Sequence, residues 1–453
     1  MGIRKRNSTR RSIFGQANSP RSKRRSLAFE TCETRTLLAG NITATLVGTT
    51  LNIVGDTDAN TVFITKPNST RVTVSGQSTT VNGSAAPLNF TGVLNLNVNL
   101  RAGNDTIVIA RSSATALNFF SSPDLINYAF GARIDAGAAM FGSVTVQGGT
   151  GDDNILMQMS TSGNVSVTDV GGLDTVALIG STVRGAYSVD SGAGSDFVIM
   201  GGSRVVSNVT YSLGAGDDYS YNENIFAGAW VVDLGVGGNT IEFFGANPTQ
   251  VSSALQPLTV KGNTGIDTVI LEGSRFQSID IDLGAGSDVL SWWGGVQTTG
   301  NVSVQGGDGN DQISIDEFAG FNGTRIGGSL VINAGAGANT VRVGELTRTG
   351  ILTRVTGAIT ITGGAQADTI ELFGVQTLST LLINSLEGID SVLLQRVTAS
   401  TEVIVNLGAG NDSLTLQMVN SAKATLRGGA NRDRLRLLGP NTITVLDQAE
   451  FEA

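Results

Sequence analysis

The chain contains no histidine and one cysteine, Cys32, among its 453 residues. The absence of histidine argues against ordinary zinc, copper and haem sites and against nucleophiles activated by an imidazole base. A single cysteine cannot form a disulfide within the chain, so cysteine usage does not reveal the redox compartment. No uninterrupted run of 18 apolar residues occurs, and we therefore expect no transmembrane segment.

Proline is scarce, with 7 residues, whereas glycine contributes 60. Valine, isoleucine, leucine, threonine, asparagine and serine supply most of the remainder. This mixture favours many short strands joined by glycine turns. Lysine and glutamate are too sparse for a coiled coil, and a mean hydropathy of +0.12 is too apolar for a disordered chain.

Charge is distributed unevenly along the chain. Residues 1–26 hold nine of the 29 Lys and Arg residues and no acid, which leaves 20 bases against 38 acids in the rest. An acidic body repels nucleic acid and attracts cations, so we expect no nucleic-acid partner. The basic stretch itself is polar and rich in turn formers, which is typical of a disordered leader.

The segment FETCETRTLLAG, residues 29–40, follows the basic stretch. It resembles the LEPR-xLL-A leader of planctomycete surface proteins. The matching residues are Phe29, Glu30, Glu33, Arg35, Leu37, Leu38 and Ala39, whereas Cys32 and Thr34 depart from the usual Leu and Pro or Asp. The resemblance implies that residues 1–40 form an export leader to the periplasm, wall or exterior, and it implies no activity. An alternative is that the basic stretch binds RNA or anionic lipid.

A glycine-rich G-x-G-x-D turn recurs through the body of the chain. Its acid or amide falls at Asn60, Asp105, Asp153, Asp174, Asp196, Asp218, Asn239, Asp267, Asp288, Asp311, Asn339, Asp368, Asp390, Asp412 and Asp433. From Asp153 onward the spacing is mostly 21–23 residues, with three gaps of 28 or 29. The two earlier gaps, 45 and 48 residues, are each near two units and predict one turn in each that has lost its signature.

Apolar residues alternate with polar ones on both sides of each turn, which predicts strand, turn and strand. Positions two and four after the acid are apolar in nearly every copy, as in Ile107 and Ile109, and the Asp218 copy is the exception. With a short return segment, one unit makes a coil whose strands pair in parallel with the next coil. The sequence therefore predicts an all-β, right-handed parallel β-helix of roughly 17 coils of about 22 residues. We assign residues 41–438 to this helix with its N-terminal cap, and residues 439–453 to a C-terminal tail or cap.

The turn also resembles the calcium-binding nonapeptide G-G-x-G-x-D-x-U-x of RTX proteins. The copies at residues 148–155 and 306–313 fit it best, although here the signature appears once per coil rather than every nine residues. Stacked carboxylates suit a hard cation such as Ca²⁺. The candidate metal ligands are Asp152, Asp153, Asp196, Asp217, Asp218, Asp308, Asp311 and Asp412. The alternative is a structural role, in which each Asp accepts backbone N–H groups of its own turn.

For function we expect a secreted or cell-surface structural or adhesive protein, with the cell envelope, extracellular matrix or polysaccharide as partner and calcium as the one expected cofactor. We expect no enzyme, because the sequence shows no catalytic pattern. The alternative is a polysaccharide-binding or polysaccharide-cleaving protein similar to pectate lyases. Inserts at residues 246–250 and 317–321 could form a groove, and Tyr219 and Tyr221 occupy outward positions where sugars stack. Trp292 falls at an inward position and favours core packing.

Overall fold

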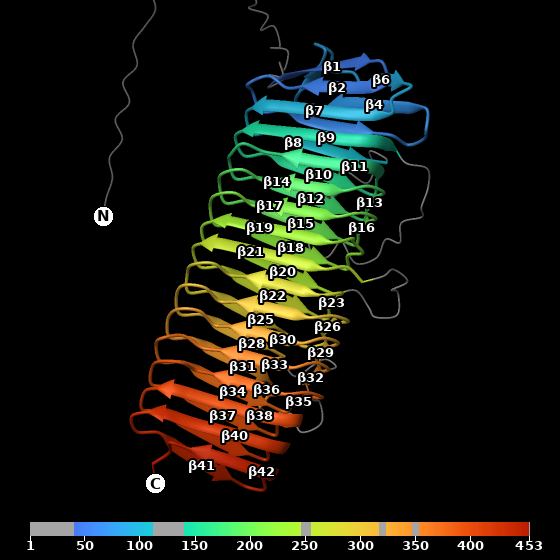
Figure 1. Cartoon of the computed structure of the whole chain (residues 1–453). Coiled ribbons are helices and arrows are strands. Elements are labelled where there is room, and N and C mark those ends of the chain that lie inside the picture. Colours follow the sequence, from blue (N-terminus) through green and yellow to red (C-terminus); the bar gives the residue numbers. More distant parts are fainter. Residues whose placement is uncertain (1–39, 112–139, 246–254, 317–322, 347–352, 453) are drawn as a thin grey trace, which may run out of the picture. The chain divides into compact units, whose positions relative to one another are not determined.

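Each coil of the solenoid contributes one strand after the glycine-rich turn, and these strands form a ladder that we call the exit ladder. The computed structural model describes residues 40–111, 140–245, 255–316, 323–346 and 353–452. Within them the exit strands pair in parallel, in sequence order, from blue to red in Figure 1. The strands are β3 (Thr61–Thr65), β8 (Thr106–Ala110), β10 (Asn154–Gln158), β12 (Thr175–Ile179), β15 (Phe197–Gly201), β18 (Tyr219–Glu223), β20 (Thr240–Phe244), β22 (Thr268–Glu272), β25 (Val289–Trp292), β28 (Gln312–Ile315), β31 (Thr340–Gly344), β34 (Thr369–Phe373), β37 (Ser391–Gln395), β39 (Ser413–Gln417) and β41 (Arg434–Leu438).

A second ladder, the entry ladder, leads into the turns, and it is also parallel from β2 onward. Its strands are β2 (Thr50–Val54), β7 (Asn95–Ala102), β9 (Phe141–Thr150), β11 (Thr161–Thr168), β14 (Tyr187–Asp190), β17 (Val209–Ser212), β19 (Trp230–Val236), β21 (Leu258–Thr264), β24 (Ile279–Asp282), β27 (Val302–Gln305), β30 (Leu330–Asn333), β33 (Ile359–Thr362), β36 (Leu381–Asn384), β38 (Thr398–Ala409), β40 (Asn420–Ala430) and β42 (Thr442–Ala449).

Short strands between the two ladders return the chain to the entry side. They are β13 (Thr182–Val183), β16 (Arg204–Val205), β23 (Arg275–Phe276), β26 (Gln297–Thr298), β29 (Arg325–Ile326), β32 (Thr353–Val355) and β35 (Val375–Thr377). Their parallel pairing continues into the first residues of β38. The predicted parallel β-helix is therefore confirmed.

The turn acid sets the register of the exit ladder. All fifteen exit strands begin at the residue directly after the aligned Asp or Asn. Positions two and four after the acid point inward, so that Ile107 and Ile109 are buried beside Ile155 and Met157 of the next coil. In the exceptional coil the inward Ser220 and Asn222 are also buried, and Asn222 donates to the Ser220 hydroxyl at 3.0 Å.

The lengths of the two wide gaps had suggested one additional coil in each. Within the described residues, neither gap contains such a coil. Strand β3 pairs directly with β8, and β8 pairs directly with β10, so these three coils are neighbours. Part of the first gap instead forms antiparallel strands at the N-terminal end, which pair with β3 and with each other. The cap comprises β1 (Asn41–Val47), β4 (Arg71–Gly76), β5 (Thr80–Val81) and β6 (Leu88–Thr91). Antiparallel strands provide hydrogen-bond partners for the backbone N–H and C=O groups at the edge of the first coil, and no further full coil is needed.

Glycine is required where consecutive turns approach most closely. A Cβ built on Gly309 would lie 1.3 Å from the carbonyl oxygen of Gly286, two residues before the acid of the preceding coil. Non-glycine residues can still take the turn conformation, since Leu386 and Asn431 have φ values of 77° and 82°. The repeat therefore continues through copies that lack the full glycine signature, at some cost in backbone strain.

The core is one apolar column enclosed by the ladders. Trp292 is fully buried in it, as its inward position predicted. A second, smaller buried cluster lies on the outer face of the first exit strands. Its members are Phe63, Val108, Ala110, Leu156, Ala177, Ile179 and Ile199. The outer face of this ladder therefore changes character along the solenoid.

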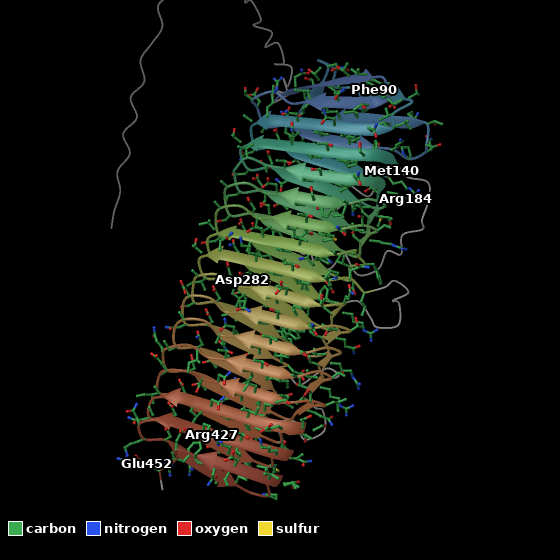
Figure 2. The ribbon with its side chains drawn as sticks, in the orientation of Figure 1. Phe90, Met140, Arg184, Asp282, Arg427 and Glu452 are labelled. Atoms are coloured by element: carbon green, nitrogen blue, oxygen red, sulfur yellow. The ribbon has the colours of Figure 1, made fainter. Side chains whose placement is uncertain are left out.

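The C-terminal residues continue the entry ladder. Strand β42 pairs in parallel with β40, and Arg427 of β40 bonds to Asp447 of β42 at 2.7 Å. Glu452 pairs with Arg432 at 2.7 Å. Figure 2 shows Arg427 and Glu452 near this end of the solenoid, and Asp282 in its middle part. No helix long and apolar enough to cross a membrane occurs in the part of the chain that the structure describes.

Stacked aliphatic side chains should dominate stability. Ile281 is fully buried between Val260 and Val304 of the adjacent coils. Ile281→Ala should lower the free energy of unfolding by about 2–5 kcal/mol, because it leaves a cavity in a column that cannot collapse. Urea unfolding followed by circular dichroism measures this loss.

The neighbouring Asp280 is exposed and provides the matched control. Asp280→Ala should change stability by less than about 0.5 kcal/mol, as exposed substitutions usually do. Equal effects of the two substitutions would contradict the assignment of inward and outward faces.

Candidate metal centre and carboxyl ladder

The turn acids form a continuous buried ladder of their own. In each coil the backbone N–H of the aligned Asp or Asn donates to the side-chain Oδ1 of the aligned residue in the next coil. The fourteen links run from Asn60 to Asp433 with N···O distances of 2.6–2.9 Å. A turn bends the backbone away from its strand partner, and the carboxyl replaces the missing acceptor. The structural role is therefore a bond between coils, whereas the structural alternative drawn from the sequence was a bond within each turn.

The second carboxyl oxygen of these acids has no such partner. Oδ2 is buried and accepts no hydrogen bond in eleven of the ladder acids: Asp105, Asp153, Asp174, Asp196, Asp218, Asp267, Asp288, Asp311, Asp390, Asp412 and Asp433. Asp368 differs, because its Oδ2 accepts the Gly364 N–H at 2.6 Å. An unpaired buried carboxylate oxygen is costly unless it gains a proton or a cation.

The asparagine copies show what surrounds the second oxygen. Asn239 donates its side-chain amide to the Gly237 carbonyl at 3.1 Å, and Asn339 donates to the carbonyls of Gly335 and Gly337 at 3.3 and 3.1 Å. Oδ1 of the asparagine and aspartate copies accepts the same N–H from the preceding coil, so we infer that Oδ2 of the aspartates takes the place of this amide nitrogen and faces carbonyl oxygens of its own turn. That environment favours a hydroxyl donor or a metal ion over a bare carboxylate.

Burial accordingly raises the pKa of the ladder acids from Asp105 to Asp412. The pKa rises to about 7 for Asp153, Asp174, Asp218 and Asp288, and to about 6 for Asp105 and Asp390. Loss of hydration is the largest cause in each case, and the N–H donated by the preceding coil lowers the pKa by less. The ladder therefore favours protonated carboxyl groups in mildly acidic solution.

The predicted metal ligands occupy two different places. Asp153, Asp196, Asp218, Asp311 and Asp412 belong to the buried ladder. Asp152, Asp217 and Asp308 are exposed on the turns. Asp152 there accepts the Leu173 N–H at 3.0 Å, and Asp217 accepts the Gly238 N–H at 2.8 Å, each from the following coil. The sequence-predicted set therefore does not form one site.

Asp153 lies instead in a cluster with two acids outside the predicted set, Asp169 and Asp174. All three are buried, and one carboxylate oxygen from each lies within 4.8 Å of the other two. Sequence reasoning had placed Asp174 in the repeat and had not considered Asp169. One sequence feature could have identified Asp169. It lies five residues before the turn acid, a position where no other coil carries a charged residue.

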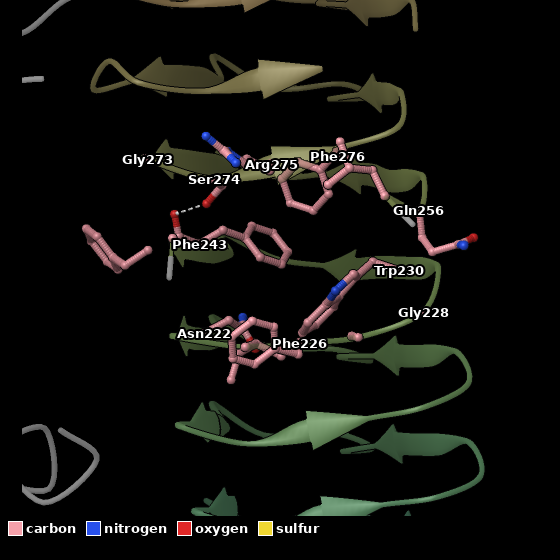
Figure 3. Close-up of a pocket in the computed structure, with 15 residues that line it drawn as sticks. Asn222, Phe226, Gly228, Trp230, Phe243, Gln256, Gly273, Ser274, Arg275 and Phe276 are labelled. Carbon is pink, nitrogen blue, oxygen red and sulfur yellow. Dashed lines mark hydrogen bonds between the residues drawn. The ribbon is translucent and has the colours of Figure 1, made fainter. Parts of the chain in front are cut away.

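The described cavities are small. One of about 90 Å³ lies beside the return segments, and its lining includes Trp230, Phe243 and Phe276. Figure 3 shows these rings between neighbouring coils, with the Ser274 hydroxyl donating to the Phe243 carbonyl at 3.2 Å. A shallower hollow of about 290 Å³ is lined by Arg325 and Arg354, which are register partners. The inserts at 246–250 and 317–321 lie outside the described residues.

An aromatic strip with acidic neighbours lies on the outer face of β15 to β25 and the residue that follows. Phe197 packs on Tyr219 with ring centroids 5.2 Å apart, and Tyr221 packs on Phe244 at 5.3 Å. Trp293 follows at 6.2 Å from Phe244. The carboxyl groups beside the strip belong to Glu223, Glu242 and Glu272, and burial raises the pKa of each. The expected outward placement of Tyr219 and Tyr221 agrees with these contacts.

The carboxyl ladder should make stability depend on pH. The folded-state pKa values of about 6 to 7 exceed the ordinary value of 3.8, so the folded chain binds more protons between these limits. Stability should therefore be highest near pH 4 and should fall as pH rises to about 7. Melting temperatures in chelator across pH 4–9 measure this dependence.

Asp288→Asn isolates one link of the ladder. Asn239 and Asn339 already accept the N–H of the preceding coil through Oδ1 and donate their amide to their own turn, so the variant should keep the Oδ1 link and add a donor to its turn. We expect a gain of about 1 kcal/mol at pH 8 and a shallower pH dependence. Asp308→Asn, on the exposed part of a turn, is the control. A destabilised Asp288→Asn variant at pH 8 would contradict the proposed surroundings of Oδ2.

Compared with known proteins, the chain matches no family model, no curated protein and no solved structure. Its function therefore has to be argued from the residues and the geometry of the chain itself.

Proposed function

We propose that this protein is an exported structural or adhesive scaffold of the cell surface or extracellular matrix, and that it is not an enzyme. The observation that carries the proposal is the unbroken carboxyl ladder, which links fifteen consecutive turns. A body in which every repeat uses its polar turn residue for stacking is organised for extension and stability. The absence of histidine from the sequence supports the non-catalytic part.

Location outside the cytoplasm rests on the leader and on charge. The leader, residues 1–40, carries the LEPR-xLL-A resemblance, and residues 1–39 lie outside the described part of the chain. The acidic body that follows suits surroundings rich in divalent cations, which screen its charge and can bridge it to other acidic polymers. Cell envelope, matrix and polysaccharide are the partners that this chemistry fits.

Export should depend on the leader pattern. In the producing cells the mature N-terminus should lie near Asn41, and the protein should fractionate with the envelope or medium. Glu30→Ala combined with Arg35→Ala should leave a full-length precursor in the cytoplasm. Cell fractionation with N-terminal sequencing measures both.

Cys32 departs from the leader pattern and supplies the control for export. Cys32→Ser should be exported and cleaved like the wild type. A full-length wild-type protein found in the cytoplasm would overturn the proposal.

Polysaccharide binding is a second candidate function, and the aromatic strip favours it. Tyr219 and Tyr221 of β18 and Phe244 of β20 offer partly exposed rings on two successive coils. Glu242 and Glu223 accept hydrogen bonds from the two tyrosine hydroxyls. Rings that stack on a sugar face beside oriented carboxyl groups are a recurrent arrangement for carbohydrate recognition. The strip follows the solenoid axis, as an extended polymer would require.

The strip predicts which residues a polysaccharide would need. Tyr219→Ala with Tyr221→Ala should weaken retention on immobilised polysaccharide at least tenfold, because two stacking platforms are lost. The matched control is Ser413→Ala with Thr415→Ala, two uncharged residues at the same outward positions of a distant coil. Affinity electrophoresis through neutral and acidic polysaccharides measures retention. Unchanged migration of the tyrosine variant would rule out the strip as the binding surface.

A further inference from the structure

We propose that Asp153, Asp169 and Asp174 hold one divalent cation of the calcium type in the interior of the solenoid. The three carboxyl groups come from two consecutive coils and from two kinds of position, the turn ladder and the end of an entry strand. This site is independent of the scaffold function, since it concerns an ion bound within the fold.

Asp169 occupies a position where a carboxyl group is unique in this chain. Five residues before the turn acid, the other coils carry glycine, alanine, serine or leucine, such as Ser191, Leu213 and Ala334. That position points at the turn acid of its own coil: a Cβ built on Gly306 would lie 2.7 Å from Oδ2 of Asp311. The carboxyl group of Asp169 accordingly lies beside that of Asp174, with a carboxylate oxygen of each within 4.8 Å of the other.

The preceding coil leaves room for this carboxyl group. Gly148 holds the equivalent position there, and a Cβ built on it would lie 2.0 Å from Oδ2 of Asp169. Any other residue at 148 would displace the acid. The absence of a side chain at Gly148 lets Asp169 reach Asp153 of that coil as well as Asp174 of its own.

The site offers hard oxygen ligands that nothing else in the described structure uses. Oδ1 of Asp169 is held by the N–H groups of Val170 and Gly149 at 2.7 and 3.1 Å, whereas its Oδ2 is buried without a partner. Oδ2 of Asp153 and of Asp174 is likewise buried and unpartnered. At most 4% of any of the three residues is exposed, so water reaches none of them freely.

Further ligands follow from the asparagine copies. Because Asn239 and Asn339 donate to the carbonyl two residues earlier, the second oxygens of Asp153 and Asp174 face the carbonyls of Gly151 and Gly172. Three carboxyl groups and turn carbonyls give an all-oxygen set of the kind that Ca²⁺ takes, with six to eight ligands at about 2.3–2.6 Å. A mutual oxygen separation within 4.8 Å admits an ion of that size.

Charge distinguishes this place from the rest of the ladder. Elsewhere each turn acid meets its neighbours one coil apart and can be neutralised by a single proton. Here a third acid is added, and no described lysine or arginine pairs with any of the three. One divalent cation relieves the mutual repulsion of all three groups at once.

Calcium titration of chelator-treated full-length protein tests the site. By isothermal titration and by metal analysis after dialysis, Asp169→Ser should bind one calcium ion fewer per chain than the wild type. Serine already holds the equivalent position at 191 and 385, where its hydroxyl donates to a carbonyl of the next coil at 2.8 and 2.7 Å. The variant should therefore fold, and calcium should raise the wild-type melting temperature by several degrees more than that of the variant.

Two further variants keep the test decisive. Asp169→Asn retains the acceptor for Val170 and Gly149 and should bind calcium at least tenfold more weakly. Asp288→Asn, in a distant link of the same ladder, should bind as the wild type does. Equal calcium stoichiometry in wild type and Asp169→Ser would overturn the proposal. So would a wild type that takes up no calcium at millimolar concentration, which would show that protons alone neutralise the three acids.

Discussion

The structure depends on one hydrogen bond repeated at every turn, from a backbone N–H to the carboxyl or amide oxygen one coil further along. Strand ladders satisfy the backbone only while the chain runs straight, and each turn leaves a buried donor without an acceptor. The turn acid supplies that acceptor at 2.6–2.9 Å in fourteen consecutive links. Registration of the turns then fixes the inward and outward faces of the strands that follow.

The hydrogen bond between coils places an ionisable carboxyl group in the interior, where water does not solvate it. One oxygen of each acid is bonded, and the other faces carbonyls in the interior. The chain meets this difficulty in different ways along its length. An amide replaces the acid at residues 239 and 339, the Gly364 N–H bonds to Asp368, and the pKa is raised at acids such as Asp288. Stability is thereby linked to the proton and cation content of the surroundings, as suits a protein proposed to work outside the cytoplasm.

Side chains on the outer face of the exit ladder vary in chemical type along the solenoid more than those on the inner face do. Inward positions are restricted to side chains that fill a narrow column, whereas outward positions change from an apolar cluster near Val108 to aromatic rings near Tyr221. Further along, Arg342 and Glu371 form an ion pair of 2.7 Å on neighbouring coils. In such a solenoid the inward residues stack the coils, and the outward residues are free to bind other molecules. Binding specificity should therefore reside in the outward side chains.

The sequence by itself determined the fold class, the repeat and the register. The alternation of apolar residues and the recurrent glycine turn are local signals, and each exit strand begins directly after the acid that the alignment identified. Length alone was a poor guide in the two wide gaps, because the first gap contains antiparallel strands of the cap, and across the second gap β8 pairs directly with β10. Only the tertiary structure decided that the acids link neighbouring coils, and that Asp152, Asp217 and Asp308 are exposed while Asp153 is buried. The tertiary structure also brought Asp169 beside Asp153 and Asp174. This contact joins two coils and depends on the absence of a side chain at Gly148, so the spacing of residues within one repeat does not reveal it.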